Sequence, residues 1–164
     1  MAKQLTAHAA TSKSIRAGLK KLNIKLVSVR GKSYAGGNSV TVEVQDLSPA
    51  QYKLAHSLVE DHQYGRFDGM NDSYDYSNER EDIPQVKYTF ISNTFSDEMY
   101  DKALAVLTPE NTIGLDIGEI PSSYSETRDN YKLRELIQRI LSGRDSCNFF
   151  SKMLWSNEEL GLTA

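Results

Sequence analysis

The sequence predicts an α+β fold: a three-stranded, mainly antiparallel sheet in the order αββαβα, followed by additional C-terminal helices. Three observations predict it. Several segments carry apolar residues at helical spacing, other short segments alternate apolar with polar residues, and glycine- or proline-containing stretches separate them. A chain of 164 residues is long enough to bury a core of its own.

The first predicted helix ends at about Asn23. Thr11 or Ser12 is expected to cap its start, because a hydroxyl group there accepts a hydrogen bond from an otherwise unpaired backbone N–H. Apolar residues follow at helical spacing, at Ile15, Leu19 and Leu22. One face of this helix is therefore expected to be buried.

Two strands are expected next, at residues 24–30 and 39–45. Both segments are rich in β-branched residues that alternate with polar ones. The glycines between them suit a hairpin loop longer than the two-residue type. The two strands should therefore be antiparallel neighbours.

The next helix, strand and helix have clear start signals. Ser48 followed by Pro49 begins a helix that reaches about His62. Residues 85–92 form the third strand, and Ser96 caps the helix that follows it. The strand is expected to carry Val86, Tyr88 and Phe90 on one side. The helix is expected to face the sheet with Met99, Ala103, Val106 and Leu107.

The remainder divides the chain into a core domain at 1–107 and an extension at 108–164. Residues 108–129 are polar and interrupted by Gly and Pro, which indicates a long connection. Residues 130–143 form a strongly amphipathic helix with Gly143 as its stop. We expect this linker and C-terminal helical extension to be packed on the core.

An aromatic segment follows that helix. Phe149, Phe150 and Trp155 lie within a few residues of one another, among other apolar side chains. Such a cluster is typical of a core, and it is also typical of an interface centre. Phe149 and Trp155 are therefore candidates for core packing and for partner binding.

Charge is unevenly distributed. Residues 1–42 contain eight basic and no acidic residues, whereas residues 43–164 contain 11 basic and 22 acidic residues. The basic helix and the loop end of the hairpin formed by the first two strands are expected to form one continuous patch for nucleic acid, with Tyr34 stacking on a base. A solvated helix that faces the acidic body of the same chain is the alternative. The candidate nucleic-acid-binding residues are Arg16, Lys20, Lys21, Arg30, Lys32 and Tyr34.

Residues 64–82, YGRFDGMNDSYDYSNERED, are acidic and rich in tyrosine. As a structural turn, this stretch would use Gly65 and Gly69 at positive φ, Phe67 and Met70 as core plugs, and aspartates bound to local N–H groups. As a recognition surface, it would face a basic protein with tyrosines as anchors. The candidate partner-binding residues here are Asp68, Asp72, Tyr74, Asp75 and Tyr76.

No pattern indicates catalysis, a metal site or a cofactor. The aspartates lack the spacing of a calcium loop, and the Gly-rich loop lies between strands instead of before a helix. The sequence therefore favours a protein that is not an enzyme. The alternative is a cleft lined by His62, Arg66 and Asp68.

The sequence favours a cytoplasmic location. It contains no apolar run long enough to span a membrane, and its first residues lack the apolar segment of a signal peptide. A single cysteine, Cys147, excludes an internal disulfide and fits a reducing compartment. The oligomeric state is not predicted.

Two stretches resemble a known family. SIRAGLKKLNIKLVSVRGKSYAGGNSVTVEVQD and, after a helix, GRFDGMNDSYDY resemble the large polyvalent protein-associated domains over roughly residues 10–107. Where this family often carries a second strand like SWTDG, this chain has TVEVQDLSP. The matching positions are Ile15, Arg16, Leu19, Lys20, Ser28, Val29, Arg30, Tyr34, Gly36, Gly37, Phe67, Asp68, Gly69, Met70 and Asp72.

The resemblance implies an origin on phages or conjugative elements, where such domains accompany proteins that protect incoming DNA. It implies no enzymatic activity. The expected function is therefore non-catalytic binding that inhibits a host defence protein or nucleoprotein complex, as an anti-CRISPR or anti-restriction protein. A nucleic-acid-binding module that uses the basic helix and hairpin tip is the alternative.

Overall fold

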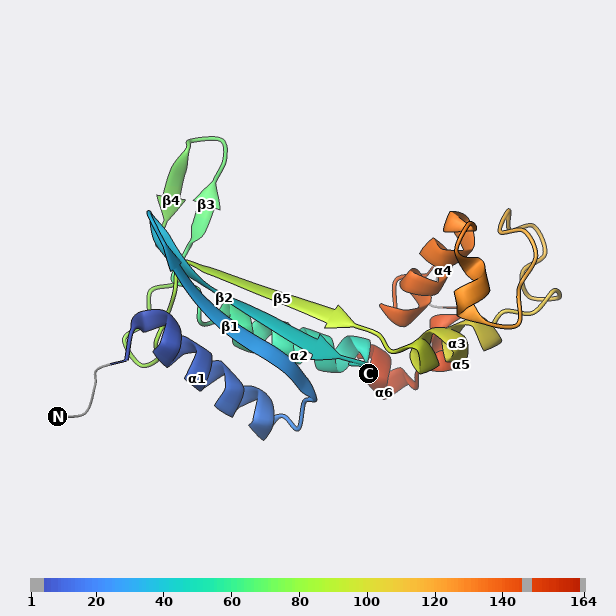
Figure 1. Cartoon of the computed structure of the whole chain (residues 1–164), viewed down its shortest axis with the longest axis horizontal. Helices are drawn as coiled ribbons and strands as arrows, with labels where there is room; N and C mark the ends of the chain where they lie inside the picture. Colours follow the sequence, from blue (N-terminus) through green and yellow to red (C-terminus); the bar gives the residue numbers. More distant parts are fainter. Residues whose placement is uncertain (1–4, 146–148, 163–164) are drawn as a thin grey trace. The chain divides into compact units, whose positions relative to one another are not determined.

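The computed structural model describes residues 5–145 and 149–162 (Figure 1). The chain forms two compact units. Unit 1 comprises Met1–Gln45 and Lys53–Thr94, and unit 2 comprises Asp46–Tyr52 and Phe95–Ala164. The elements up to Thr94 are α1 (Ala7–Lys21), β1 (Leu26–Tyr34), β2 (Gly37–Gln45), α2 (Pro49–Glu60), β3 (Arg66–Asp68), β4 (Ser73–Asp75) and β5 (Tyr88–Thr94).

The sheet of unit 1 has the strand order β1-β2-β5, which confirms an α+β fold with three main strands. β1 and β2 are antiparallel, as expected, with Val29 opposite Val42. β5 is parallel to β2, with Ile91 opposite Val42, so the sheet is mixed and not mainly antiparallel. The reason is topological: α2 returns the chain to the end of the sheet where β2 begins.

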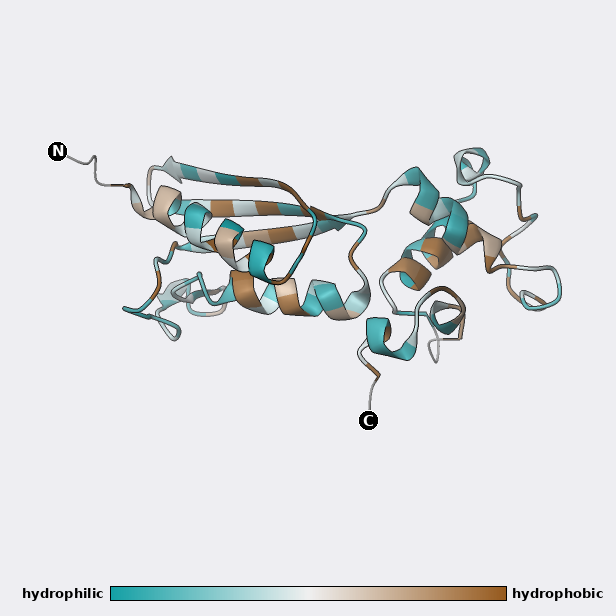
Figure 2. Cartoon of the chain, turned by 90° about the horizontal axis from the view of Figure 1, so that it is seen from below, coloured by the Kyte–Doolittle hydropathy of each residue, from teal (hydrophilic) through white to brown (hydrophobic). Residues whose placement is uncertain are grey.

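Helices α1 and α2 lie on the same side of this sheet (Figures 1 and 2). They pack closely, because a Cβ atom added at Gly18 would lie 2.6 Å from Leu58 Cδ1. Gly31 of β1 faces α1, since a Cβ there would lie 2.9 Å from the carbonyl oxygen of His8. The core between helices and sheet contains Ile15, Leu19, Val29, Val40, Val42, Val44, Ala55 and Val59.

The start of the first helix differs from the sequence prediction. The first helix begins at Ala7, with Thr6 at the N-cap, so Thr11 and Ser12 are buried inside it and cap nothing. Ser12 instead donates to the carbonyl of His8, one turn earlier, which small hydroxyl residues do readily.

Tyr88 and Phe90 do not share the buried side of β5. Val86 is fully buried, but it bridges to Gln63 outside the β2–β5 register. Within that register Phe90 lies opposite Thr41, and 56% of Phe90 is exposed. Strand residues alternate between faces, so Tyr88 and Phe90 lie on the side of the sheet away from α1 and α2.

Unit 2 is helical and has its own core. Its elements are α3 (Asp97–Ala105), the short 3-10 helix η1 (Tyr124–Thr127), α4 (Tyr131–Leu141), α5 (Ser151–Leu154) and α6 (Asn157–Leu160). Ser96 caps α3, and Gly143 at φ 66° follows α4, both as predicted. The core contains Ala103, Leu104, Leu107, Ile117, Leu133, Ile137, Ile140, Leu141, Phe150 and Trp155.

The apolar side of α3 belongs to this core. Ala103, Leu104 and Leu107 pack with residues of α4, and Met99 and Val106 pack against the same cluster. The expectation that this helix faces the sheet was therefore wrong. The expected packing of residues 108–164 on the sheet-bearing unit stays a prediction.

Among the residues that the structure describes, no helix is long and apolar enough to cross a membrane.

Candidate binding surface

The acidic, tyrosine-rich stretch forms a β-hairpin, β3–β4. Phe67 pairs with Tyr74, and Asp68 accepts hydrogen bonds from Met70 N and Asn71 Nδ2. These contacts lower the pKa of Asp68, because the backbone N–H of Met70 and the amide of Asn71 favour the carboxylate. The prediction that Asp68 binds local N–H groups is confirmed.

The glycines of this hairpin do not act as predicted. The left-handed position is taken by Asp72, at φ 48°, and neither Gly65 nor Gly69 has a positive φ. Gly65 is instead needed for close approach, because a Cβ atom there would lie 1.9 Å from the carbonyl oxygen of Asp75. A side chain at Gly69 would meet only Phe67, at 4.0 Å.

The hairpin tip presents apolar side chains to solvent. Phe67 is 54% exposed and Met70 is 95% exposed, so neither plugs the core as predicted. Asp72 and Asp75, also on the hairpin, are exposed. We call Phe67, Met70 and Asp72 the hairpin tip; Asp75 lies at the base of the hairpin, opposite Arg66. An exposed apolar pair with an acidic rim is typical of protein-binding sites.

A row of aromatic rings connects the hairpin to the sheet. Tyr64 stacks on Tyr76, with ring centroids 5.7 Å apart, and Tyr74 meets the edge of both. Tyr74 also contacts Tyr88 at 5.8 Å, and Tyr88 stacks on Phe90 at 6.5 Å. The row therefore runs from the hairpin onto the face of the sheet that α1 and α2 leave open.

Tyr74 is the central ring of this row. Its hydroxyl donates to the carbonyl of Lys87 at 2.5 Å, and the Lys87 ammonium lies 5.1 Å from its ring centroid. The same ammonium donates to the carbonyl of Gly36, at the turn between β1 and β2. Tyr74 and Lys87 thus fix the hairpin to the sheet.

Burial, and after it the neighbouring Tyr64 and Tyr88, raise the pKa of Tyr74 to about 12. We expect its ionisation about two pH units above that of an exposed tyrosine. Because the pKa of Tyr74 is higher in the folded than in the unfolded protein, the protonated hydroxyl stabilises the fold. This contribution is complete below about pH 10 and is lost as the pH rises towards 12. Ultraviolet titration of phenolate absorbance should show a late step that Tyr74→Phe removes; an unchanged titration in this variant would contradict the assignment.

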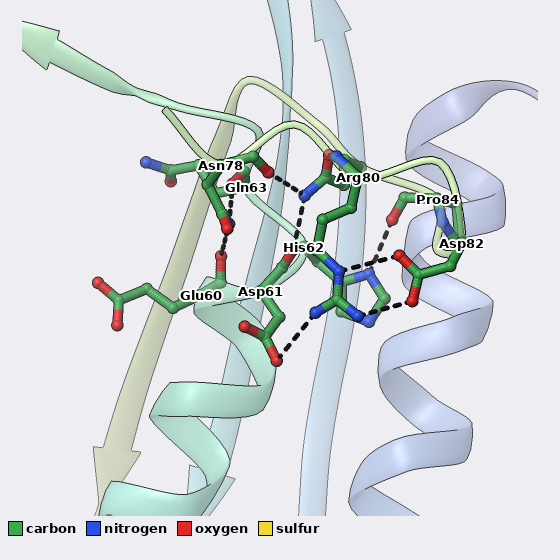
Figure 3. A network of polar contacts seen from close by, with 9 residues as sticks. Glu60, Asp61, His62, Gln63, Asn78, Arg80, Asp82 and Pro84 are labelled. Carbon is green, nitrogen blue, oxygen red and sulfur yellow. Dashed lines mark hydrogen bonds and ion pairs between the residues drawn. The ribbon is translucent and has the colours of Figure 1, made fainter. Parts of the chain in front are cut away.

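A polar network holds the connection between α2 and β5 (Figure 3). Asn78 Nδ2 donates to the carbonyl of Gln63 at 2.8 Å, and Gln85 Nε2 donates to the carbonyls of Asp61 and Asn78 at 2.7 and 2.8 Å. The buried His62 donates from Nδ1 to the carbonyl of Pro84 at 2.7 Å. These bonds satisfy backbone groups that no strand partner reaches.

The proposed catalytic trio is not assembled. His62 is buried in this network, Arg66 pairs with Glu60 at 3.0 Å, and Asp68 serves the hairpin turn. The three side chains therefore have separate partners. In the part of the chain described here, no three His, Cys, Asp or Glu residues gather to hold a metal ion, and Cys147 lies outside that part.

Two half-open hollows flank Glu60 and Gln63. The smaller, of about 320 Å³, is lined by His56, Val59, Glu60, Gln63, Thr89, Phe90 and Ile91. The larger, of about 480 Å³, is lined by Ser57, Glu60, Asp61, Gln63, Gly65, Arg66, Asp75, Ser77 and Asn78. Gln63 lines both hollows. Its side chain is held in place by two hydrogen bonds, since its Oε1 accepts from Thr89 N and its Nε2 donates to the carbonyl of Gly65.

The predicted basic patch is split between two sides of the sheet. Gly31 faces α1, so Arg30, Lys32 and Tyr34 lie on the opposite face. Arg16 donates to the carbonyl of Val29 from the α1 side. The other two helical residues, Lys20 and Lys21, are exposed on α1 itself. The candidates therefore form two groups, not one continuous patch.

The two aromatic candidates of unit 2 also separate. Phe149 is 55% exposed, whereas Trp155 is only 8% exposed and belongs to the core of that unit. Trp155 is therefore a packing residue and not a surface anchor. Phe149 contacts Phe150 edge to face at 5.0 Å.

No protein-family model, curated protein or solved structure matches the chain. The resemblance to the large polyvalent protein-associated domains therefore stays an expectation based on the quoted motifs.

Proposed function

We propose that the protein acts by binding another protein through the hairpin tip, without catalysis. The observation that carries this proposal is the exposure of Phe67 and Met70 on a hairpin that is fixed to the sheet. An apolar pair on a backbone that is already ordered can be buried without the cost of ordering a loop, so it makes an effective anchor.

Charge supports a partner with a basic surface. Asp72 and Asp75 are exposed beside the apolar pair. The basic residues nearby are already paired, Arg66 with Glu60 and Arg80 with Asp82. A cationic partner surface would approach favourably and in the correct orientation.

The motif resemblance suggests the class of partner. It favours a phage or conjugative element as the origin of the chain, and a CRISPR effector or restriction enzyme of the host as its target. Such proteins carry basic surfaces that hold nucleic acid, which an acidic hairpin would complement. Inhibition would then be steric, inside the host cytoplasm.

The test combines the variant Phe67→Ala/Met70→Ala with transformation of a targeted plasmid into cells that carry the defence system. The wild-type protein is expected to raise transformation efficiency, and the double variant to lose most of this effect. Loss of two anchors should weaken binding to the purified effector by about 2 kcal/mol or more.

Ile113→Ala is the control, because Ile113 is 83% exposed and lies in unit 2. It should behave as wild type. If the wild-type protein gives no protection against any defence system tested, the target class is wrong. If the double variant protects fully, the hairpin tip is not the contact surface.

A further inference from the structure

The face of the sheet opposite α1 and α2 forms a second surface, separate from the hairpin tip. No helix of unit 1 lies on this side among the residues described (Figure 1). Its side chains come from alternate positions of the three strands. They are Ser28, Arg30, Lys32 and Tyr34 on β1, Ser39, Thr41 and Glu43 on β2, and Tyr88, Phe90 and Ser92 on β5.

This face carries aromatic rings, and two of them are exposed. Phe90 is 56% exposed, and Tyr34 at the end of β1 is 44% exposed. Tyr88 and Phe90 are nearly parallel, with an interplanar angle of 20°. Phe90 has no core role, since the buried side of the sheet is filled by valines. The exposed rings of Phe90 and Tyr34 on a rigid sheet offer stacking surfaces for unpaired bases, whereas Tyr88 is half-buried and already contacts Tyr74 and Lys87.

The charge of the face is suitable for phosphates. Glu43 is the only carboxylate in the three strands, and Arg30 binds it through two hydrogen bonds of 3.0 and 2.8 Å while Ser28 donates at 2.7 Å. These contacts lower the pKa of Glu43, first through Ser28 and then through Arg30. Its charge is thus compensated, and Lys32 is exposed.

Unit 1 as a whole also carries a positive net charge. Unit 1 carries 12 basic and 9 acidic residues, a net charge of +3, whereas unit 2 carries 7 basic and 13 acidic residues, a net charge of −6. Apart from Glu43, the acidic residues of unit 1 all lie within residues 60–82. The anionic character of the whole chain therefore does not extend to the sheet.

We propose that this face binds single-stranded nucleic acid, with bases stacked on Phe90 and Tyr34, Tyr88 supporting the ring of Phe90 from the side, and phosphates near Lys32. Duplexes are not expected to bind in the same way, because their bases are already stacked on one another. The site lies on different residues from the hairpin tip. The two proposals can therefore fail independently.

The experiment measures fluorescence anisotropy of labelled single strands of roughly 20 nucleotides, as DNA and as RNA, with the full chain. Binding should weaken as salt rises from about 50 to about 200 mM. Phe90→Ala should lower affinity roughly 5- to 150-fold, the range measured for loss of one stacking ring. The DNA and RNA arms show which sugar is preferred.

Two matched controls locate the site. Phe67→Ala removes a ring of nearly equal exposure, 54%, from the hairpin tip, and should leave affinity unchanged. Lys32→Glu should weaken binding, whereas Lys20→Glu, on α1 at the opposite side, should have little effect.

Three results would overturn the proposal. These are no single-strand binding at low salt, equal affinity for a duplex of the same sequence, and equal losses for Lys20→Glu and Lys32→Glu. The first would leave the face as a protein contact, and the third would indicate attraction to overall charge without a defined site. Circular dichroism of each variant establishes that it is folded.

Discussion

Gly65→Ala is expected to release the β3–β4 hairpin from its position and to destabilise the protein by roughly 3 kcal/mol. The added Cβ atom would lie 1.9 Å from the carbonyl oxygen of Asp75 and 2.6 Å from Tyr74 Cε1. Asp75 pairs with Arg66 in the hairpin, so its backbone cannot retreat while that pairing is kept. The collision involves a backbone atom, which rotamer changes cannot relieve.

Gly69→Ala is the matched control for this substitution. A Cβ atom at Gly69 meets nothing closer than 4.0 Å, and its φ is not positive. The expected change in unfolding free energy is within about 0.5 kcal/mol. Urea denaturation gives both values, and under the proposed function partner binding should be lost only in Gly65→Ala. Equal stability of the two variants would show that the hairpin does not adopt the described register.

Leu133→Ala is expected to cost about 3–5 kcal/mol, because Leu133 is fully buried in the core of unit 2. It packs among residues of α3 and α4, and its removal leaves a cavity that the surrounding side chains fill only partly. Hydrogen exchange should show lost protection in α3 and α4.

Leu115→Ala makes the same chemical change at a position that is 44% exposed. It should cost less than about 1 kcal/mol, since a half-exposed side chain leaves no enclosed cavity. If the two leucine variants lose equal stability, the core of unit 2 is not formed as described.

Local signals in the sequence located most elements. The Gly-rich hairpin, the Ser48–Pro49 helix start and the Ser96 cap each depend on neighbouring residues alone, and all three are confirmed. Ser48 even forms a reciprocal pair, since Gln51 N donates to its Oγ and its N–H donates to Gln51 Oε1. These signals can be recognised in the sequence because each depends only on residues a few positions apart.

The direction of β5 and the faces of its residues could not be read in this way. Alternation is the same whichever side is buried, and Val86 follows a different pairing from the strand that begins two residues later. The even spacing of Val86, Tyr88 and Phe90 therefore did not show that Val86 is buried while Phe90 is exposed. The available signal was Ile91, a β-branched apolar residue that alternates with Phe90 and lies opposite Val42.

The candidate surfaces were predicted only in part. Asp72, Asp75 and Tyr76 are exposed, whereas Tyr74 is half-buried and bonds to Lys87, so their roles as partner contacts stay predictions. The sequence did not indicate Phe67 and Met70 as exposed, because an apolar pair beside glycine also suits a core plug. Strands of three residues, such as β3 and β4, are too short to show a period.

The hairpin is placed within the crossover connection between two parallel strands, and not within the sheet. The pairing of β2 with β5 uses no residue between Arg66 and Asp75. Substitutions at the hairpin tip therefore leave the strand pairing intact, so under the proposed function the contact surface can change while the scaffold is kept. Exchanging residues 66–75 between relatives would be the direct way to transfer that recognition.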